Sequence, residues 1–255
     1  MVETLTLLLI GGVAGFLSSL LGIGGGVILI PLLIYVGHIQ ILVATSVSVV
    51  AIIFASSAGT VAHYGRGNVH IATGIWMGVA SIASALGGAL LSGYFPDALL
   101  YYLYMGIVTA AIIMLFLPRL RQTPNPREFH LRRLPAVLTG LFKGFMTGVL
   151  GIGGGFILVP LMIYFLDMPI HKAMGTSLAV NLFTAAAGFV GKLATGNYDL
   201  RVIFWVVLGI IPATQAGAWA ANKSSPRSLR LFLVALLMVI LVKMAWSVFL
   251  QPQGQ

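Results

Sequence analysis

The chain has no cysteine and few charged side chains. Its 255 residues include 14 lysines and arginines but only five aspartates and glutamates, and charged residues make up 7% of the total. Without cysteine there is no disulfide framework, no thiolate metal ligand and no cysteine nucleophile. Soluble domains carry about 25% charged residues, so this composition argues against a soluble globular protein.

Apolar segments take the place of the missing charge. Hydrophobic residues make up 59% of the chain, and the mean hydropathy is +1.05. These segments recur along the whole chain, so neither a single anchor nor a cleavable signal explains them. We therefore expect an all-α polytopic membrane protein in a cell membrane of the bacterial inner-membrane type. The basic excess fits cytoplasmic loops that face anionic lipid, with membrane lipid rather than nucleic acid as their partner.

One stretch of the sequence occurs twice. Leu21–Pro31 reads LGIGGGVILIP, and Leu150–Pro160, 129 residues later, reads LGIGGGFILVP. The pair Gly67-Asn68 returns at the same offset as Gly196-Asn197. This pattern predicts two homologous halves, residues 1–117 and 135–255, joined by a basic cytoplasmic linker at 118–134.

Each glycine stretch interrupts a long apolar segment. The first segment, residues 4–36, would be about 50 Å long as one helix, whereas the hydrocarbon core is about 30 Å thick. We therefore expect a glycine-broken, re-entrant hairpin-like helix pair and then three transmembrane helices in each half. The expected helices cover about 5–20, 27–36, 41–64, 71–93 and 98–117, then 136–150, 156–166, 172–193, 202–221 and 229–250.

The glycines predict an anion site. Backbone N–H groups at a glycine bend, followed by the N-terminus of a short helix, bind anions through the positive end of the helix dipole. Two alternatives are close helix packing and a dinucleotide phosphate loop, which needs an acidic residue about 20 positions further on. No acidic residue stands there. The candidate substrate-binding glycines are Gly24, Gly25, Gly26, Gly153, Gly154 and Gly155.

Polar side chains after each glycine stretch are the other candidates. Hydroxyl and amide groups can donate to the oxygens of an anion, although serine and threonine in membrane helices also bond their own backbone. An intramembrane lysine is a functional-site hypothesis by default. The candidates of this kind are Thr45, Ser46, Thr176, Ser177, Asn181 and Lys143.

The placement of acidic and histidine residues limits the chemistry. All five carboxylates fall at termini or in loops, so we expect no acid at mid-membrane. The five histidines fall at helix ends or in the linker, where we expect them to be solvated. No metal-ligand spacing is present, so we expect no cofactor, no metal and no catalytic residue. The remaining function classes are a secondary transporter of a small anion, an anion channel and, less favoured, an intramembrane enzyme.

The repeated motif resembles that of a known family. Two copies of the glycine motif, each followed by a Thr-Ser pair (Thr45-Ser46 and Thr176-Ser177), resemble the TauE/SafE (TSUP) family of sulfite exporters. The resemblance covers essentially the whole chain. It implies export of sulfite or a related sulfur-containing organic anion, such as sulfoacetate or thiosulfate, by alternating access. It leaves the transported anion, the coupling ion and the oligomeric state open.

Loop charges favour one topology. If each broken segment is a hairpin, the clusters at 171–172 and 223–230 lie in the cytoplasm together with the linker, and Lys192 and Arg201 lie outside. If each segment crosses once, these positions are reversed. The larger cluster favours the hairpin. We therefore predict inverted-topology repeats whose glycine tips converge near the midplane, with both termini periplasmic.

Overall fold

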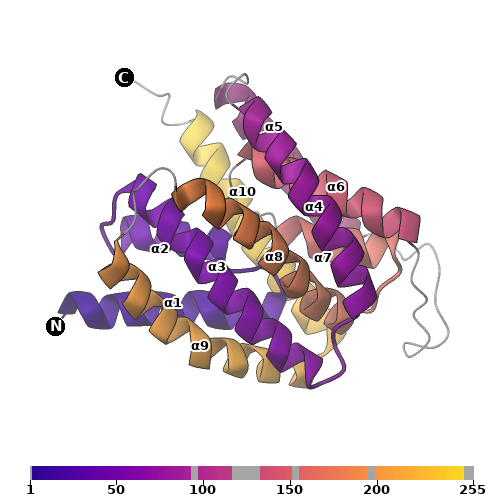
Figure 1. The fold of residues 1–255 in the computed structure, drawn as a ribbon, viewed down its shortest axis with the longest axis horizontal. Coiled ribbons are helices and arrows are strands. Elements are labelled where there is room, and N and C mark those ends of the chain that lie inside the picture. Colours follow the sequence, from indigo (N-terminus) through magenta and orange to yellow (C-terminus); the bar gives the residue numbers. More distant parts are fainter. Residues whose placement is uncertain (1, 93–96, 117–132, 151–154, 194–198, 250–255) are drawn as a thin grey trace.

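The computed structural model describes residues 2–92, 97–116, 133–150, 155–193 and 199–249, and within these ranges the regular structure is helical. Figure 1 shows the helices packed against one another in a single bundle. In chain order they are α1 (Val2–Leu21), α2 (Gly26–Tyr35), α3 (Ile41–Tyr64), α4 (Ile71–Ser92), α5 (Asp97–Phe116), α6 (Arg133–Leu150), α7 (Gly155–Phe165), α8 (Ile170–Leu193), α9 (Leu200–Lys223) and α10 (Pro226–Phe249).

The helix boundaries agree with the sequence prediction to within a few residues, with one correction at the linker. Arg133 and Leu134, which we expected in the linker, form the start of α6. Residues 118–132 lie outside the described residues. Among the described residues, four stretches are long and apolar enough to cross a membrane: Thr4–Leu21, Ser46–Tyr64, Ile71–Gly88 and Leu200–Lys223.

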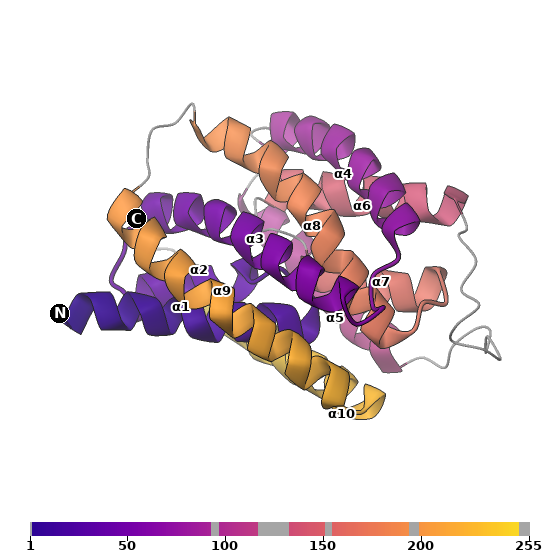
Figure 2. The ribbon, with the colours of Figure 1, turned by 60° about the horizontal axis from the view of Figure 1, so that its bottom comes forward.

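The first apolar segment folds back on itself. Between α1 and α2 the chain turns, and Leu29 and Leu33 of α2 then share a buried cluster with Leu7 and Ile10 of α1. Helix α2 therefore runs back along α1 in a hairpin (Figure 2). Glycine makes this turn possible, because Gly22, Gly24 and Gly25 have φ of +70°, +77° and +76°, in the left-handed region that other residues rarely adopt.

The most extensive helix contacts join the two halves of the chain: α1 packs on α9, and α4 packs on α6. At Gly11 of α1 an added Cβ would lie 2.1 Å from the carbonyl oxygen of Val206 in α9, and at Gly15 it would lie 2.8 Å from that of Ile210. The contacting positions increase together, so α1 and α9 run parallel. Equivalent contacts join α6 to α4, where Gly140 packs on Met77 and Gly144 on Ser81. Each residue lies 129 positions from its counterpart in the contact of α1 with α9.

Helices α3 and α8 cross in the opposite sense. An added Cβ at Gly59 would lie 2.8 Å from Leu178 Cδ1, and one at Gly188 would lie 3.7 Å from Val49 Cγ1. Positions increase along α3 as they decrease along α8, so the two helices are antiparallel. Each has 24 residues, which gives about 36 Å, enough to cross a hydrocarbon core of about 30 Å.

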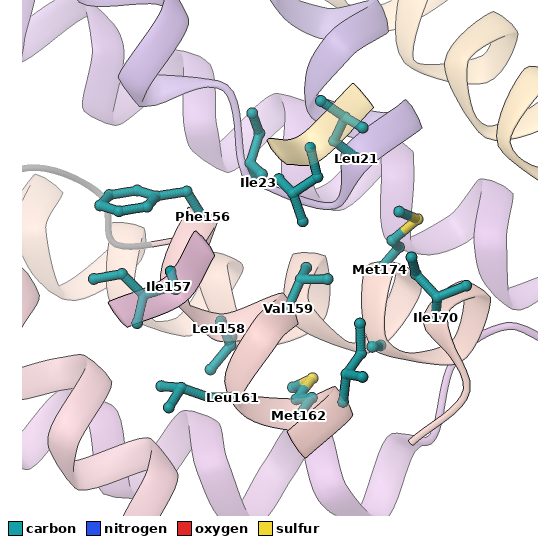
Figure 3. Close-up of a cluster of buried hydrophobic side chains, with 14 of the residues drawn as sticks. Leu21, Ile23, Phe156, Ile157, Leu158, Val159, Leu161, Met162, Ile170 and Met174 are labelled. Carbon is teal, nitrogen blue, oxygen red and sulfur yellow. The ribbon is translucent and has the colours of Figure 1, made fainter. Parts of the chain in front are cut away.

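The short helix α7 lies at the centre of the larger apolar cluster. Every residue from Gly155 to Ile163 is buried, and Figure 3 shows Phe156, Leu158 and Met162 among side chains from α1 and α8. The first nine residues of α7 are therefore surrounded by protein, whereas Phe165 at its end is 47% exposed. Its partner in the other half, α2, is only partly buried.

Candidate anion-binding site

The turn between α1 and α2, residues 22–25, is called here the first glycine break. The Ile23 N–H donates to Ser18 O at 3.1 Å, and the N–H groups of Ile28 and Leu29 donate to Gly25 O. The first N–H groups of a helix have no intrahelical acceptor, and those of Gly26 and Val27 have no acceptor in the described part of the chain. The break therefore presents the unpaired N–H groups of Gly26 and Val27 at a helix N-terminus. Anion binding by Gly24, Gly25 and Gly26 stays a prediction.

Helix α8 packs against this break with polar side chains. The Ser177 hydroxyl donates to Gly22 O, and it also lies 2.8 Å from Met174 O. One turn further along α8, the Asn181 side-chain nitrogen lies 2.7 Å from the position of a Cβ on Gly24. Both of these predicted residues therefore lie at the break. They come from the opposite half of the chain.

Asn181 is the buried polar side chain with the most unused bonding capacity. It is 1% exposed, and neither its oxygen nor its nitrogen has a hydrogen-bond partner in the described part of the chain. A buried amide without a partner costs about 1–3 kcal/mol, and such groups are rare in native proteins. Asn181 therefore requires a partner, such as water or a ligand.

The start of α7 also reaches this site. A Cβ on Gly155 would lie 2.0 Å from Ile23 O and 2.5 Å from the Asn181 side-chain nitrogen. The first glycine break and the N-terminus of α7 therefore meet at Asn181, which lies near the middle of α8. The other second-half glycines that we predicted, Gly153 and Gly154, lie outside the described residues.

Two serines complete the surroundings of the break. Ser18 Oγ lies 3.4 Å from the position of a Cβ on Gly25, and Ser48 Oγ lies 3.2 Å from that on Gly26. Both hydroxyls are buried without a partner in the described chain. Ser46 is buried, and the side chain of Thr45 is outside the described set. Thr176 lies elsewhere, since it accepts a hydrogen bond from the His70 N–H between α3 and α4.

A buried lysine lies beside the same face of α8. Lys143 of α6 is 0% exposed and donates to the Thr184 hydroxyl, which in turn donates to Val180 O at 2.9 Å. Ser177, Asn181 and Thr184 follow at spacings of four and three residues, so they share one helix face. No carboxylate partner of Lys143 occurs among the described residues. An ammonium in such surroundings favours an anion nearby.

Basic side chains gather at one end of the bundle, called here the cation-rich end. The α3–α4 connection meets the end of α9 through a hydrogen bond between Asn68 and Asn222, at 3.3 Å. The start of α8 joins them, because the His171 ring contacts Ala221 O and Ser224 O. The basic residues of these segments and of the neighbouring starts of α6 and α10 are Arg66, Arg133, Lys172, Lys223, Arg227 and Arg230.

Two histidines at this end depart from the sequence expectation. Partial burial, followed by the charge of Lys172, lowers the pKa of His70. His63 corrects our expectation of a solvated side chain: it is 0% exposed, and its Nε2 lies 2.9 Å from Ser19 O. Its Nδ1 is buried without a partner in the described chain. Sequence reasoning judged His63 from its place near a helix end and missed this burial.

No cluster of three or more histidine, aspartate or glutamate side chains occurs among the residues that the structure describes. The polar groups at the break are amides, hydroxyls, backbone N–H groups and one amine. Such groups donate hydrogen bonds, and they suit the oxygens of an anion.

The apolar spans, the interrupted helix and the buried donors define a multi-pass membrane protein of the transporter class. The model of the sulfite exporter TauE/SafE family matches residues 7–244, and the chain belongs to this family. It is 30% identical over 226 residues to the probable membrane transporter protein YdhB of Bacillus subtilis (strain 168), covering 87% of this chain and 90% of that protein.

Other relatives carry the same description. A probable membrane transporter protein of Xylella fastidiosa (strain 9a5c) is 32% identical over 230 residues, 84% of each chain. One of Methanocaldococcus jannaschii is 27% identical over 252 residues, 92% of each chain. No solved structure matches the chain at a significant level.

Proposed function

We propose that the protein is a secondary transporter of a small anion, sulfite or another sulfur-containing anion such as sulfoacetate or thiosulfate, which it exports by alternating access. The observation that carries the proposal is the unpaired, buried amide of Asn181 between the first glycine break and the start of α7. The family name supports sulfite. The buried donors support an anion in general.

The anion oxygens bind the backbone N–H groups of Gly26 and Val27 and the amide nitrogen of Asn181. A helix N-terminus stabilises a negative charge through its dipole. Lys143, joined to the same face of α8 through Thr184, supplies the positive charge. Together these groups replace the hydration shell of the anion.

We further propose that the halves are inverted repeats. Helix α1 and helix α3 run in the same direction, because Leu7 clusters with Ala44 while Ser19 contacts His63. Helix α4 returns after a short connection, so it runs opposite to α1. Its counterpart α9 instead runs parallel to α1, which is what inversion of the second half requires.

The distribution of charge supports the same topology. The basic residues of the cation-rich end are those that the hairpin topology places in the cytoplasm. Arg201, by contrast, lies at the start of α9, at the opposite end of that helix. Because cytoplasmic loops carry an excess of lysine and arginine, this end faces the cytoplasm. The site between α1, α7 and α8 then lies near mid-depth, where inverted-repeat transporters bind substrate.

The experiment is uptake into proteoliposomes across sulfite, thiosulfate, sulfoacetate and sulfate. A transporter gives a saturable flux with a preference among these anions, and the accumulated anion is chemically unchanged. A flux that rises linearly with concentration and shows no counter-transport would instead identify an anion channel. A chemically altered product would identify an enzyme, and absence of flux for all four anions would contradict the proposed substrate class.

A further inference from the structure

One face of α3 carries a line of polar and small residues from the glycine break to the cation-rich end. Ser48, Ser56, Gly59 and His63 follow at spacings of eight, three and four residues, so they lie on one helix face. Ser48 faces Gly26, Gly59 faces Ser19, and His63 contacts Ser19 O. The line is 15 residues long, or about 22 Å.

The hydroxyls on this line lack partners. Ser48 and Ser56 of α3 and Ser18 and Ser19 of α1 are at most 1% exposed, and their Oγ atoms have no hydrogen bond in the described chain. Several buried or half-buried hydroxyls elsewhere bond the carbonyl three or four residues earlier, as those of Ser81, Thr139, Thr147 and Thr214 do. The serines on this line therefore differ from ordinary serines in membrane helices.

We propose that this face of α3, opposite the last turns of α1, lines the route by which the anion passes between the glycine break and the cytoplasm. The inference rests on the proposed transport function. A route must supply hydrogen bonds to an anion as it sheds water, and unpaired hydroxyls placed about one or two turns apart do so. The basic residues around Arg66 at its outer end attract anions to the entrance.

The route is closed in this conformation. At Gly59 an added Cβ would lie 2.8 Å from Leu178 Cδ1 and 3.5 Å from Ser19 Oγ, so α1, α3 and α8 are packed together there. Nearer the cytoplasm, His63 joins α3 to α1 through Ser19 O. Opening requires α3 to move away from α1, which breaks this one hydrogen bond and frees the hydroxyls for the anion.

Cysteine reactivity tests the route in a chain without native cysteine. Inside-out vesicles containing Ser56→Cys are treated with an anionic sulfonatoethyl and a cationic trimethylammonioethyl methanethiosulfonate of similar size. Labelling is measured by mass spectrometry. Val61→Cys is the matched control, because Val61 lies on the opposite face of α3, within the apolar span Ser46–Tyr64, and is 69% exposed.

We expect Ser56→Cys to react with the anionic reagent roughly 100-fold faster than Val61→Cys, since charged groups are excluded from hydrocarbon. The anionic-to-cationic rate ratio should exceed that of free cysteine. Equal rates at the two positions, or a preference for the cationic reagent, would overturn the route. Ser19→Cys gives a second test from α1 should Ser56→Cys fold poorly. Labelling is measured without any transport substrate, so loss of flux in the proteoliposome panel would contradict the proposed function and leave this result intact.

Discussion

The hydroxyl of Ser177 donates a hydrogen bond to the carbonyl oxygen of Gly22, which fastens α8 in the second half of the chain to the end of α1 in the first. Four residues along α8, Asn181 lies against Gly24. The site is thus assembled from both halves, and neither half alone contains it.

Adding a methyl group to the glycine break should abolish transport. Gly24 has φ of +77°, and a Cβ there would lie 2.7 Å from the Asn181 nitrogen. Gly24→Ala therefore strains the backbone by roughly 1–2 kcal/mol and displaces the amide. We expect uptake to be lost while the protein still inserts and elutes as a single species in size-exclusion chromatography. Gly12→Ala is the control, because nothing lies within 4 Å of a Cβ at Gly12, and wild-type uptake by Gly24→Ala would contradict the site.

The amide of Asn181 should set the apparent affinity. Asn181→Ala removes a hydrogen bond to a charged group, worth roughly 1.5–3 kcal/mol, so KM should rise about 10- to 150-fold. Asn181→Asp should abolish uptake, because a carboxylate repels the anion. Gln215→Ala, which removes an exposed amide that bonds Ala58 O, serves as the control. Unchanged KM in both Asn181 variants would assign this residue to packing.

Lys143 should be needed for transport and dispensable for folding. Lys143→Met keeps the volume of the side chain and removes a buried charge, and replacing buried charges by apolar groups is often neutral or stabilising. We expect the melting temperature in detergent to stay the same or rise and uptake to be lost. Lys143→Arg should retain part of the uptake. If Lys143→Met clearly lowers the melting temperature but the molecules that stay folded transport at the normal rate, the role of Lys143 is structural instead.

Single cysteines test the inverted topology. Ser225 lies between α9 and α10 at the cation-rich end, and Asn197 precedes α9. On intact cells, a membrane-impermeant maleimide should label Asn197→Cys and leave Ser225→Cys unlabelled until the membrane is permeabilised. The reverse pattern would show that the halves have the same orientation.

The positions of the helices and of the first break were predictable because they follow from local physics. A 33-residue apolar segment, as one helix, is longer than the membrane is thick, and the glycines mark the position of the break. Asn181 and Ser177 were also predictable, since polar groups are rare in these segments. Thr184 could have been found from its three-residue spacing to Asn181, and His63 from its helical spacing to Ser56. Their burial could not, because it arises where α3 meets α1 and where α8 meets α6, and these contacts join residues more than 40 positions apart.

The packing of α1 on α9 has a consequence for biosynthesis. The glycine-lined face of α1 is complete once about 20 residues have been made, but its partner begins at Leu200. At about 5–20 residues per second, translation takes roughly 10–40 s to supply that partner. During this interval α1 must wait in the membrane or in the insertion machinery with its contact face open. Ribosome stalling before α9 should therefore leave α1 exposed to degradation, so synthesis of the last fifth of the chain commits the protein to its folded form.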